Sequence, residues 1–340
     1  MSGPRGSRRR RTPLAAILAT VALTTVGCGA ASTAAVPPVR APVVLPGGAS
    51  AYAAGAPAGS ADSCGGVPVE ASRPALPAVP PPGAMPTGSY EAAIYQRGYL
   101  IAGVDQNTYL FGYRDPATGA LSGFDIDMLH QVSQAIFGDP NKIRFVVVAN
   151  ADRVSAAQTG RVDVVAETMT ITCSRKQSVA FSTVYFEAGQ RILVPNGSRI
   201  SGSTGLAGQR VCAPAGSTSL TNLAALPVSP KPTLTQVANQ SDCLVLLQQD
   251  QVDAISTDDT ILDGFAAQDP NVGLVGPAFT KEPYGMAMSR AHPEFTAFVN
   301  AVLAAERANG TWASIYSRWL GPFDGGKVPA PPVASYNPGG

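Results

Sequence analysis

The chain has 340 residues, of which 45% are hydrophobic and 14% charged, and its formal net charge at pH 7 is +1. This length allows one large or two medium-sized domains. Five arginines and no acidic residue lie within residues 1–27, so removal of that segment takes the formal charge from +1 to −4. A chain of this balance lacks the basic surface of a nucleic-acid-binding protein, and we expect no nucleic-acid partner.

Residues 1–27 have the order of features typical of an export signal. An arginine-rich start precedes an apolar stretch at residues 13–26, which is short for a membrane span. Gly27-Cys28 then resembles the end of a bacterial lipobox, although Thr25 stands where an aliphatic residue is usual. We expect a lipoprotein signal peptide and a lipidated Cys28. Secretion with cleavage elsewhere is the alternative, and the sequence does not separate the Sec from the twin-arginine route.

Two segments are rich in Ala, Pro, Gly and Ser, a composition that buries little apolar area and favours extended conformations. We expect residues 28–87 to be a disordered tether and residues 323–340 a disordered tail. Cys64 is the exception within the tether, because a cysteine there implies a covalent link to the folded body.

With Cys28 assigned to lipid, an even number of cysteines remains, which in an exported protein favours disulfides. The four are Cys64, Cys173, Cys212 and Cys243, and they allow three sets of pairs. No paired C-x-x-C spacing is present and the chain has only two histidines, so we expect no metal site. We also expect no cofactor.

Globular patterns begin near Tyr90. Residues 99–104 (YLIAGV) and 143–148 (IRFVVV) predict buried strands, and residues 124–138 predict an amphipathic helix that ends at Gly138. Residues 293–310 and 311–321 predict a pair of helices, the first opened by Pro293. Strands alternating with helices predict an α/β protein.

The sequence repeats itself weakly at an offset of 90 residues. DRVSAAQTGRVDVVAETMT starts at Asp152 and DCLVLLQQDQVDAISTDDT starts at Asp242. The coinciding pairs are Asp152/Asp242, Gln158/Gln248, Val162/Val252, Asp163/Asp253 and Thr170/Thr260. Each copy predicts a helix, a short strand and a polar loop, so we expect two related lobes. Ligands bind at such strand ends in open α/β sheets.

Four ordered stretches carry a resemblance to a known family: GYRDPATGALSGFDIDM, TGRVDVVAETMTITCSRKQSVAFSTVYF, VDAISTDDTIL and PEFTAFVNAVLAAERANGTWASIYSRWLG. The region resembles extracellular solute-binding proteins of polar amino-acid ABC transporters (family 3), among them actinobacterial glutamine-binding lipoproteins. The resemblance implies a periplasmic-binding-protein-like (type II) fold. Lobe 1 would span residues 88–190 plus 284–322, and lobe 2 residues 191–283. Hinge strands would lie near residues 189–195 and 279–288, with the ligand held between the lobes.

The resemblance also implies how the backbone end of an amino acid is held. Arg175 matches the family's carboxylate-binding arginine and Thr170 its hydroxyl partner, while Thr168 matches a position that meets the ammonium group. Ser217 and Thr218, at a predicted helix start, resemble a second clamp for the carboxylate. The chemistry agrees, because a guanidinium and helix-terminal N–H groups suit a carboxylate. A surface arginine and ordinary polarity at a strand end are the alternatives for Arg175 and Thr170.

The ammonium group of the ligand needs a carboxylate as its partner. The resemblance selects Asp258 from the loop STDDT for this role. A solvated acidic turn is the alternative. By the same resemblance, Arg153 and Asp105 would face the ligand's side chain, with Tyr109 beside them. A pocket of this kind favours Asp, Glu, Asn or Gln. Each of the three residues has an alternative role. Arg153 could pair with Asp152 or solvent, Asp105 could stabilise a turn, and Tyr109 could belong to the core.

The lobe division that the resemblance implies places Cys212 and Cys243 together in lobe 2, so we expect them to form one disulfide. Cys173 would then pair with Cys64 and attach the tether to lobe 1 beside the ligand loop. A free, reactive Cys173 at a helix N-terminus is the rival interpretation.

The resemblance implies a monomeric, lipid-anchored receptor on the extracytoplasmic face of the membrane that presents a polar amino acid to an ABC permease. A sensor subunit that signals to a membrane partner is the alternative, because it would use the same pocket. Some enzymes share the fold, but Glu167 is the only carboxylate placed to suggest catalysis, and alternation along its strand would turn it away from the site. We therefore expect a binding protein without enzymatic activity.

Overall fold

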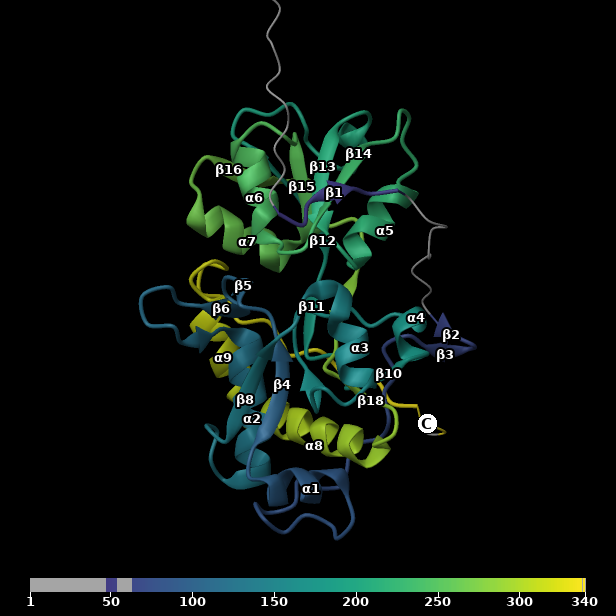
Figure 1. The fold of residues 1–340 in the computed structure, drawn as a ribbon, viewed down its shortest axis with the longest axis vertical. Helices are drawn as coiled ribbons and strands as arrows, with labels where there is room; N and C mark the ends of the chain where they lie inside the picture. The colour runs from purple at the N-terminus through teal and green to yellow at the C-terminus, as the bar shows by residue number, and fades with distance from the viewer. Residues whose placement is uncertain (1–46, 54–62, 338, 340) are drawn as a thin grey trace, which may run out of the picture. The chain divides into compact units, whose positions relative to one another are not determined.

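The computed structural model describes residues 47–53, 63–337 and 339, which fold into an α/β protein with two main sheets. Lobe 1 is the part built around the five-stranded sheet, and lobe 2 is the part built around the six-stranded sheet. Figure 1 shows lobe 1 below and lobe 2 above, with β11 (Phe186–Ala188) between them. The two-lobe α/β fold class expected from the sequence is confirmed. The expected signal peptide and Cys28 lie outside the described residues.

The sheet of lobe 1 combines parallel and antiparallel strands. Its order is β10 (Val179–Phe181), β18 (Ala287–Ser289), β9 (Val164–Val165), β4 (Leu100–Val104) and β8 (Ile143–Val147). The central strand β4 runs parallel to β8 and β9, whereas β18 runs antiparallel to β9 and β10. The helices here are α1 (Tyr90–Arg97), α2 (Phe124–Phe137), α3 (Arg153–Gln158), α4 (Cys173–Lys176), α8 (Pro293–Asn309) and α9 (Thr311–Trp319), with a 3₁₀ turn at Asn150–Asp152.

The sheet of lobe 2 has the order β1 (Ser50–Ala51), β14 (Thr233–Val237), β13 (Arg210–Pro214), β15 (Ala254–Asp258), β12 (Gln190–Pro195) and β16 (Val272–Val275). Strand β13 runs parallel to both β14 and β15, so these three strands end at the same edge. The helices are α5 (Thr218–Ala225), α6 (Ser241–Gln248) and α7 (Asp259–Gln268), with a 3₁₀ turn at Ser203–Leu206.

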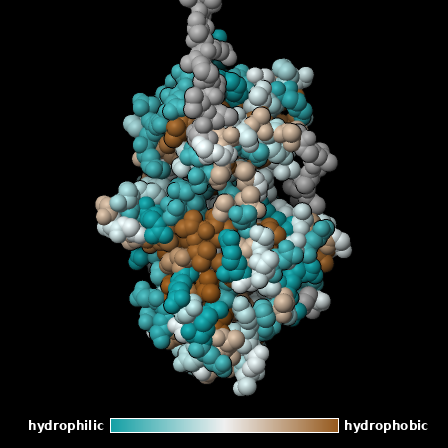
Figure 2. All heavy atoms as spheres, viewed as in Figure 1, coloured by the Kyte–Doolittle hydropathy of each residue, from teal (hydrophilic) through white to brown (hydrophobic). Residues whose placement is uncertain are grey.

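Three small sheets complete the fold. Strands β11 and β17 (Glu282–Tyr284) pair antiparallel where the chain passes between the lobes, with Phe186 opposite Tyr284. Strands β5 (Asn107–Thr108), β6 (Gly112–Arg114) and β7 (Leu121–Ser122) follow β4, and β2 (Ser63–Cys64) pairs with β3 (Val67–Pro68). Within the described residues, no helix is long and apolar enough to cross a membrane. On the face shown in Figure 2, apolar atoms gather on lobe 1. Val147 at the end of β8 is 41% exposed.

Local sequence explains where α2 begins and ends. Gly123 has φ +135°, and a Cβ atom there would lie 2.0 Å from the carbonyl oxygen of Phe111, so only glycine fits before the helix. Gly138 ends the helix in the left-handed conformation, as its sequence position predicts. One face of α2 enters the core of lobe 1 through Phe124, Ile126, Met128, Leu129, Val132 and Ile136.

The internal repeat corresponds to a repeated contact. The Asp163 carboxylate accepts from the N–H of Ile101 in β4 at 2.7 Å and forms an ion pair with Arg97. The Asp253 carboxylate accepts from the N–H of Arg210 in β13 at 2.8 Å and forms an ion pair with the side chain of the same residue. In each lobe, the Val-Asp pair therefore fastens a short strand to its parallel neighbour.

The expectation of a disordered tether is wrong for residues 47–53 and 63–87. Strand β1 adds an edge to the sheet of lobe 2, with Ser50 opposite Gln236. Farther along, Leu76 donates its N–H to Ala297 at 3.1 Å and packs against the core of lobe 1. Proline-rich backbone is stable here because its remaining polar groups find partners on a folded surface.

The expectation of a disordered tail is also wrong for the described residues up to Asn337. The N–H of Ser72 donates to Ser335 at 2.9 Å and the N–H of Asn337 donates to Ser72 at 2.7 Å. Asn300 in α8 donates to the hydroxyl of Ser72 at 2.8 Å and to the carbonyl of Arg73 at 2.7 Å. A buried asparagine thus holds the N-terminal segment, which in turn pairs with the C-terminal one.

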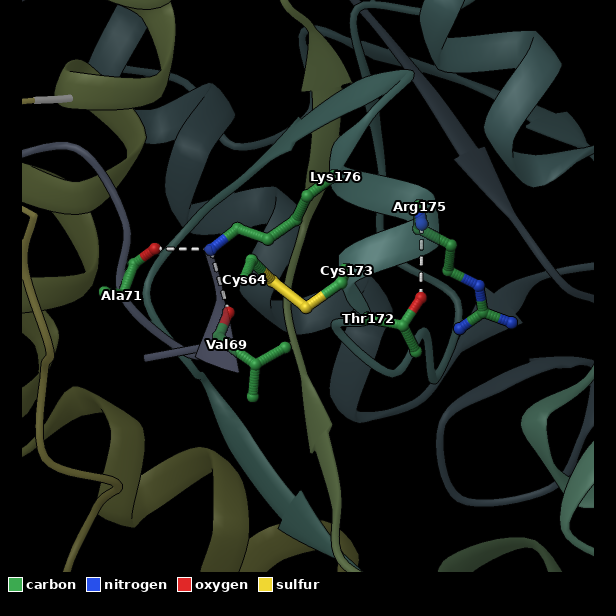
Figure 3. The surroundings of a disulfide bond; sticks show 7 residues. All are labelled: Cys64, Val69, Ala71, Thr172, Cys173, Arg175 and Lys176. Atoms are coloured by element: carbon green, nitrogen blue, oxygen red, sulfur yellow. Dashed lines mark hydrogen bonds between the residues drawn. A yellow bond between two sulfur atoms is a disulfide. The ribbon is translucent and has the colours of Figure 1, made fainter. Parts of the chain in front are cut away.

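Two disulfides join the four cysteines, Cys64 to Cys173 and Cys212 to Cys243. Figure 3 shows the first one beside Lys176, whose ammonium group donates to the carbonyls of Val69 at 2.8 Å and Ala71 at 2.6 Å. The N-terminal segment is therefore fixed to α4 by one covalent bond and two charge-assisted hydrogen bonds.

Replacing both Cys212 and Cys243 by alanine should lower the free energy of unfolding by about 3–4 kcal/mol. The bond closes a loop of 31 residues, and its loss frees the unfolded chain. Urea unfolding of wild type and variant measures the difference. Equal midpoints would contradict a stabilising role for this disulfide.

Candidate ligand-binding site

Polar loops from both lobes line one small cavity. Lobe 1 contributes Asn150, Arg153, Thr168 and Thr170, and lobe 2 contributes Pro214, Ser217, Thr218, Ser219, Gln240, Thr257, Asp258 and Ile261. The structure therefore brings together six of the residues that the sequence nominated: Arg153, Thr168, Thr170, Ser217, Thr218 and Asp258.

Asp258 is the last residue of β15, a central strand, and is 4% exposed. Its Oδ2 accepts from the hydroxyl of Tyr284 at 2.7 Å. Its Oδ1 is buried and has no hydrogen-bond partner among the described residues. Burial, and then the negative charge of Glu282, raise the pKa of Asp258 well above its ordinary value. An unused anionic acceptor at a cavity wall suits a cation or a hydrogen-bond donor.

Asp259, the other acidic residue of the same loop, has a structural role. Its Oδ1 accepts from the N–H groups of Gly189 at 3.2 Å and Thr260 at 2.8 Å, and it does not line the cavity. Of the two aspartates that the loop offers, only Asp258 is placed to meet a ligand.

Thr168 has a backbone conformation that a β-branched residue rarely adopts, with φ +42°. Its N–H donates to Asp125 Oδ2 at 2.9 Å, and the hydroxyl of Tyr185 donates to Asp125 Oδ1 at 2.7 Å. Burial raises the pKa of Asp125 to about 6. This buried carboxylate holds the strained turn after β9 in position, and strain of this kind is concentrated at functional sites.

Arg175 and Glu282 line an adjoining cleft, which shares Thr170 and Thr218 with this cavity. The guanidinium of Arg175 donates to the carbonyl of Thr170 at 2.6 Å and, across the lobes, to the carbonyl of Gly216 at 3.1 Å. Burial and the neighbouring charge of Arg153 lower its pKa. The structure places Arg175 beside the expected clamp residues, but not in the wall of the Asp258 cavity.

The clamp of lobe 2 forms at the N-terminus of α5. Ser217 caps the helix by accepting from the N–H of Leu220 at 3.3 Å. Gly216 has φ +69°, and a Cβ atom there would lie 2.7 Å from Cα of Ala151 in lobe 1. Glycine at this position lets the two lobes approach each other.

Arg153 is 3% exposed, and it is held by hydrogen bonds to backbone oxygens rather than by Asp152. Its Nε donates to the carbonyl of Asn150 at 3.0 Å and its Nη1 to the carbonyl of Glu167 at 2.8 Å. The Glu167 carboxylate is buried, lies outside the cavity wall and has no hydrogen-bond partner in the described part of the chain. Burial raises the pKa of Glu167 well above its ordinary value.

Asp105 and Tyr109 do not line the cavity. The carboxylate of Asp105 accepts from Gln240 of lobe 2 at 3.0 Å, so it lies behind a residue that does. Tyr109 packs edge-on against Tyr113, with ring centroids 5.3 Å apart. The structure makes Asp105 a support of the pocket and gives Tyr109 a place in neighbouring packing.

Sequence reasoning missed three polar residues of the site. Gln240 lines the cavity, and its Oε1 is buried without a partner among the described residues. Tyr284 holds Asp258, and Glu282 binds the hydroxyls of Thr170 and Thr218. Glu282 and Tyr284 lie in the stretch KEPYG, which the sequence suggested only as a hinge, and Gln240 carried no signal of its own.

Comparison with known proteins identifies the class. The family model described as "Bacterial extracellular solute-binding proteins, family 3" matches residues 100–322, and the chain belongs to this family. The chain is 38% identical over 230 residues to the ABC transporter glutamine-binding protein GlnH of Bacillus subtilis, which covers 67% of this chain and 84% of the relative. It is 39% identical over 198 residues to a glutamine-binding protein of Geobacillus stearothermophilus, covering 58% of this chain and 75% of the relative.

Solved structures agree with the fold. An ancestral arginine-binding protein, solved bound to arginine and also to glutamine, is 33% identical. It superposes with a TM-score of 0.62 over 66% of this chain and 99% of its own. By family, the protein is therefore a bacterial extracellular solute-binding protein.

Replacing Asp258 by Asn should stabilise the ligand-free protein by about 1–3 kcal/mol at neutral pH, because it removes a buried charge that lacks one partner. Since the pKa of Asp258 is higher in the folded than in the unfolded protein, the folded state binds the proton more tightly. This contribution therefore makes stability fall as pH rises from the unfolded pKa through the folded one.

Urea unfolding at pH 5 and pH 7.5 measures this effect. The variant should gain more at the higher pH, and the exposed Asp152→Asn should change stability by less than about 0.5 kcal/mol. A variant less stable than wild type at pH 7.5 would show that Asp258 is satisfied in the empty site.

Proposed function

We propose that this protein is a lipid-anchored extracytoplasmic receptor that binds a polar α-amino acid between its lobes and presents it to an ABC permease. The ligand is one of Gln, Glu, Asn and Asp, and glutamine fits best. The observation that carries the proposal concerns Asp258, which lines the cavity between the lobes and whose buried Oδ1 has no partner among the described residues. The ammonium group of an amino acid supplies the missing donor.

The carboxylate end of the ligand is assigned to Arg175 and the N-terminus of α5. Arg175 now donates to two carbonyl oxygens, and a ligand carboxylate is a stronger, charged acceptor for the same fork of donors. The first N–H groups of α5 have no partner within the helix and favour an anion. Arg175 from lobe 1 and α5 from lobe 2 thus hold one charged group jointly.

The side-chain end of the cavity offers both a donor and an acceptor. Arg153 lines it with a guanidinium whose Nε and Nη1 are already bonded to backbone oxygens, and Nη2 completes the donor set. Gln240 contributes its buried Oε1, which has no partner within the described ranges. A carboxamide matches this pair, since its oxygen accepts and its NH₂ donates. A carboxylate satisfies only the donor.

Relatives support the same assignment. The Bacillus subtilis and Geobacillus stearothermophilus relatives are named glutamine-binding proteins, and the ancestral arginine-binding protein was solved with glutamine. A relative from Corynebacterium glutamicum, 30% identical over 67% of this chain and 81% of its own, is named a glutamate-binding protein. The proposed anchor is Cys28, supported by the arginine-rich and apolar stretches before it.

Ligand contacts to both lobes shift the population toward the closed form, which the permease then recognises. The proposed role is binding without turnover. Release of ammonia or conversion of the bound amino acid during incubation would contradict it.

A thermal-shift screen of the twenty amino acids on the protein without residues 1–27 should raise the melting temperature with glutamine most strongly. Glutamate and aspartate should give smaller shifts, because a carboxylate leaves Gln240 without a donor. Asparagine and aspartate have shorter side chains, so they fill the cavity less. A melting temperature that responds only to basic or apolar amino acids would overturn the assigned ligand class. No response to any amino acid would overturn the receptor proposal itself.

Replacing Asp258 by Asn should weaken glutamine binding by about 30-fold or more, because the ligand's ammonium group loses its buried anionic partner. Titration calorimetry compares the variant with wild type and with Asp152→Asn, which keeps the charge of the site. In wild type, affinity should fall as pH is lowered, since the raised pKa of Asp258 leaves its carboxylate increasingly protonated. An Asp258→Asn variant that binds like wild type would remove this residue from the site.

A further inference from the structure

Glu282 is a buried carboxylate that contacts both lobes. It lies in β17, between the lobes, and is 2% exposed. Its Oε2 accepts from the hydroxyl of Thr170 in lobe 1 and from the hydroxyl of Thr218 in lobe 2, each at 2.7 Å. Its Oε1 accepts from Asn222 at 3.0 Å and Thr280 at 2.7 Å. The carboxylate therefore has four donors.

The two threonines are the residues whose hydroxyls were expected to grip the ligand's carboxylate. A hydroxyl has one hydrogen, so Thr170 and Thr218 cannot donate to a ligand while they donate to Glu282. The distance between the two hydroxyl oxygens is 3.4 Å, and one oxygen of Glu282 satisfies both. In this structure a protein carboxylate has the partners that a ligand carboxylate would need.

We propose that Glu282 is an internal competitor for the ligand's α-carboxylate. In the empty receptor it binds the hydroxyls of both lobes and holds them together, and the ligand takes these donors from it. The inference rests on the proposed function and assigns the residue that lowers the affinity of that same site.

Two physical effects of Glu282 both lower the affinity for the ligand. Hydrogen bonds that exist only in the empty receptor stabilise it relative to the complex, so they weaken binding. The charge of Glu282 also acts on the neighbouring groups. It raises the pKa of Asp258, which disfavours the ionised form that the ligand's ammonium group requires. A neutral residue of the same shape weakens the first effect, because its oxygen is a poorer acceptor, and removes the second.

Replacing Glu282 by Gln should tighten glutamine binding by about tenfold, measured by titration calorimetry, because charge-assisted bonds to the hydroxyls are lost in the empty state. The ligand-free variant should also have a larger radius of gyration in small-angle X-ray scattering, since an amide holds the two lobes together less strongly. The matched control is Glu187→Gln, which changes an exposed carboxylate on the paired strand β11 and should leave both measurements unchanged.

A second variant should change the affinity for glutamine in the opposite direction. Thr280→Val removes one donor from Oε1 of Glu282 and leaves the carboxylate more dependent on Thr170 and Thr218, so glutamine binding should weaken by about threefold. This variant also covers the case in which Glu282→Gln does not fold.

The outcomes separate the inference from the function on which it rests. Weaker or equal binding by Glu282→Gln, with wild type binding normally, would make Glu282 a support for the threonines and overturn the inference. If wild type bound no amino acid, the proposed function would fail, and the scattering comparison alone would decide whether Glu282 holds the lobes together. An unchanged radius of gyration would overturn that role.

Discussion

A carboxylate that is removed from water and lacks a partner costs folding free energy, and the site of this protein is arranged around one. Asp258 ends a central strand of lobe 2, and Tyr284, from the connection between the lobes, binds one of its oxygens. The other oxygen has no partner in the part of the chain that the structure describes. Strand β15 is paired on both sides, by β12 and β13, and this sheet keeps the group in place. In the receptor proposed above, a donor from the ligand would satisfy the free oxygen.

Lobe 1 meets this carboxylate with a loop that is held just as firmly. The turn at Thr168 is fixed by the buried Asp125, which itself accepts from Tyr185, the residue just before β11. Both loops follow strands that Val-Asp contacts fasten to their neighbours, at Asp163 and Asp253. The two lobes thus present polar groups to the cavity by the same device.

The sequence predicted the parts of this arrangement that depend on local pattern. The internal repeat and the helix ends at Gly138 and Gly310 follow from residue spacing. Family resemblance selected Asp258 and Arg153, and both line the cavity. The sequence did not predict the role of Glu282, because its partner Thr170 lies 112 residues away and leaves no local signal. The sequence did not predict the contacts of the N-terminal segment, because its composition indicates disorder. Asn300 and α4 supply the contacts that order it.

Charge balance around the cavity limits what the receptor can hold. Two guanidinium groups, Arg153 and Arg175, interact electrostatically with the carboxylates of Glu167 and Glu282, and burial raises the pKa of Asp258 nearby. A zwitterion with a neutral side chain adds one positive and one negative group and leaves the net charge unchanged. A ligand with an acidic side chain adds a further negative charge near the carboxylate of Glu282, and Coulomb repulsion is strong where water is excluded. For the receptor proposed above, this balance predicts that a neutral carboxamide side chain is accommodated at a lower electrostatic cost than a carboxylate.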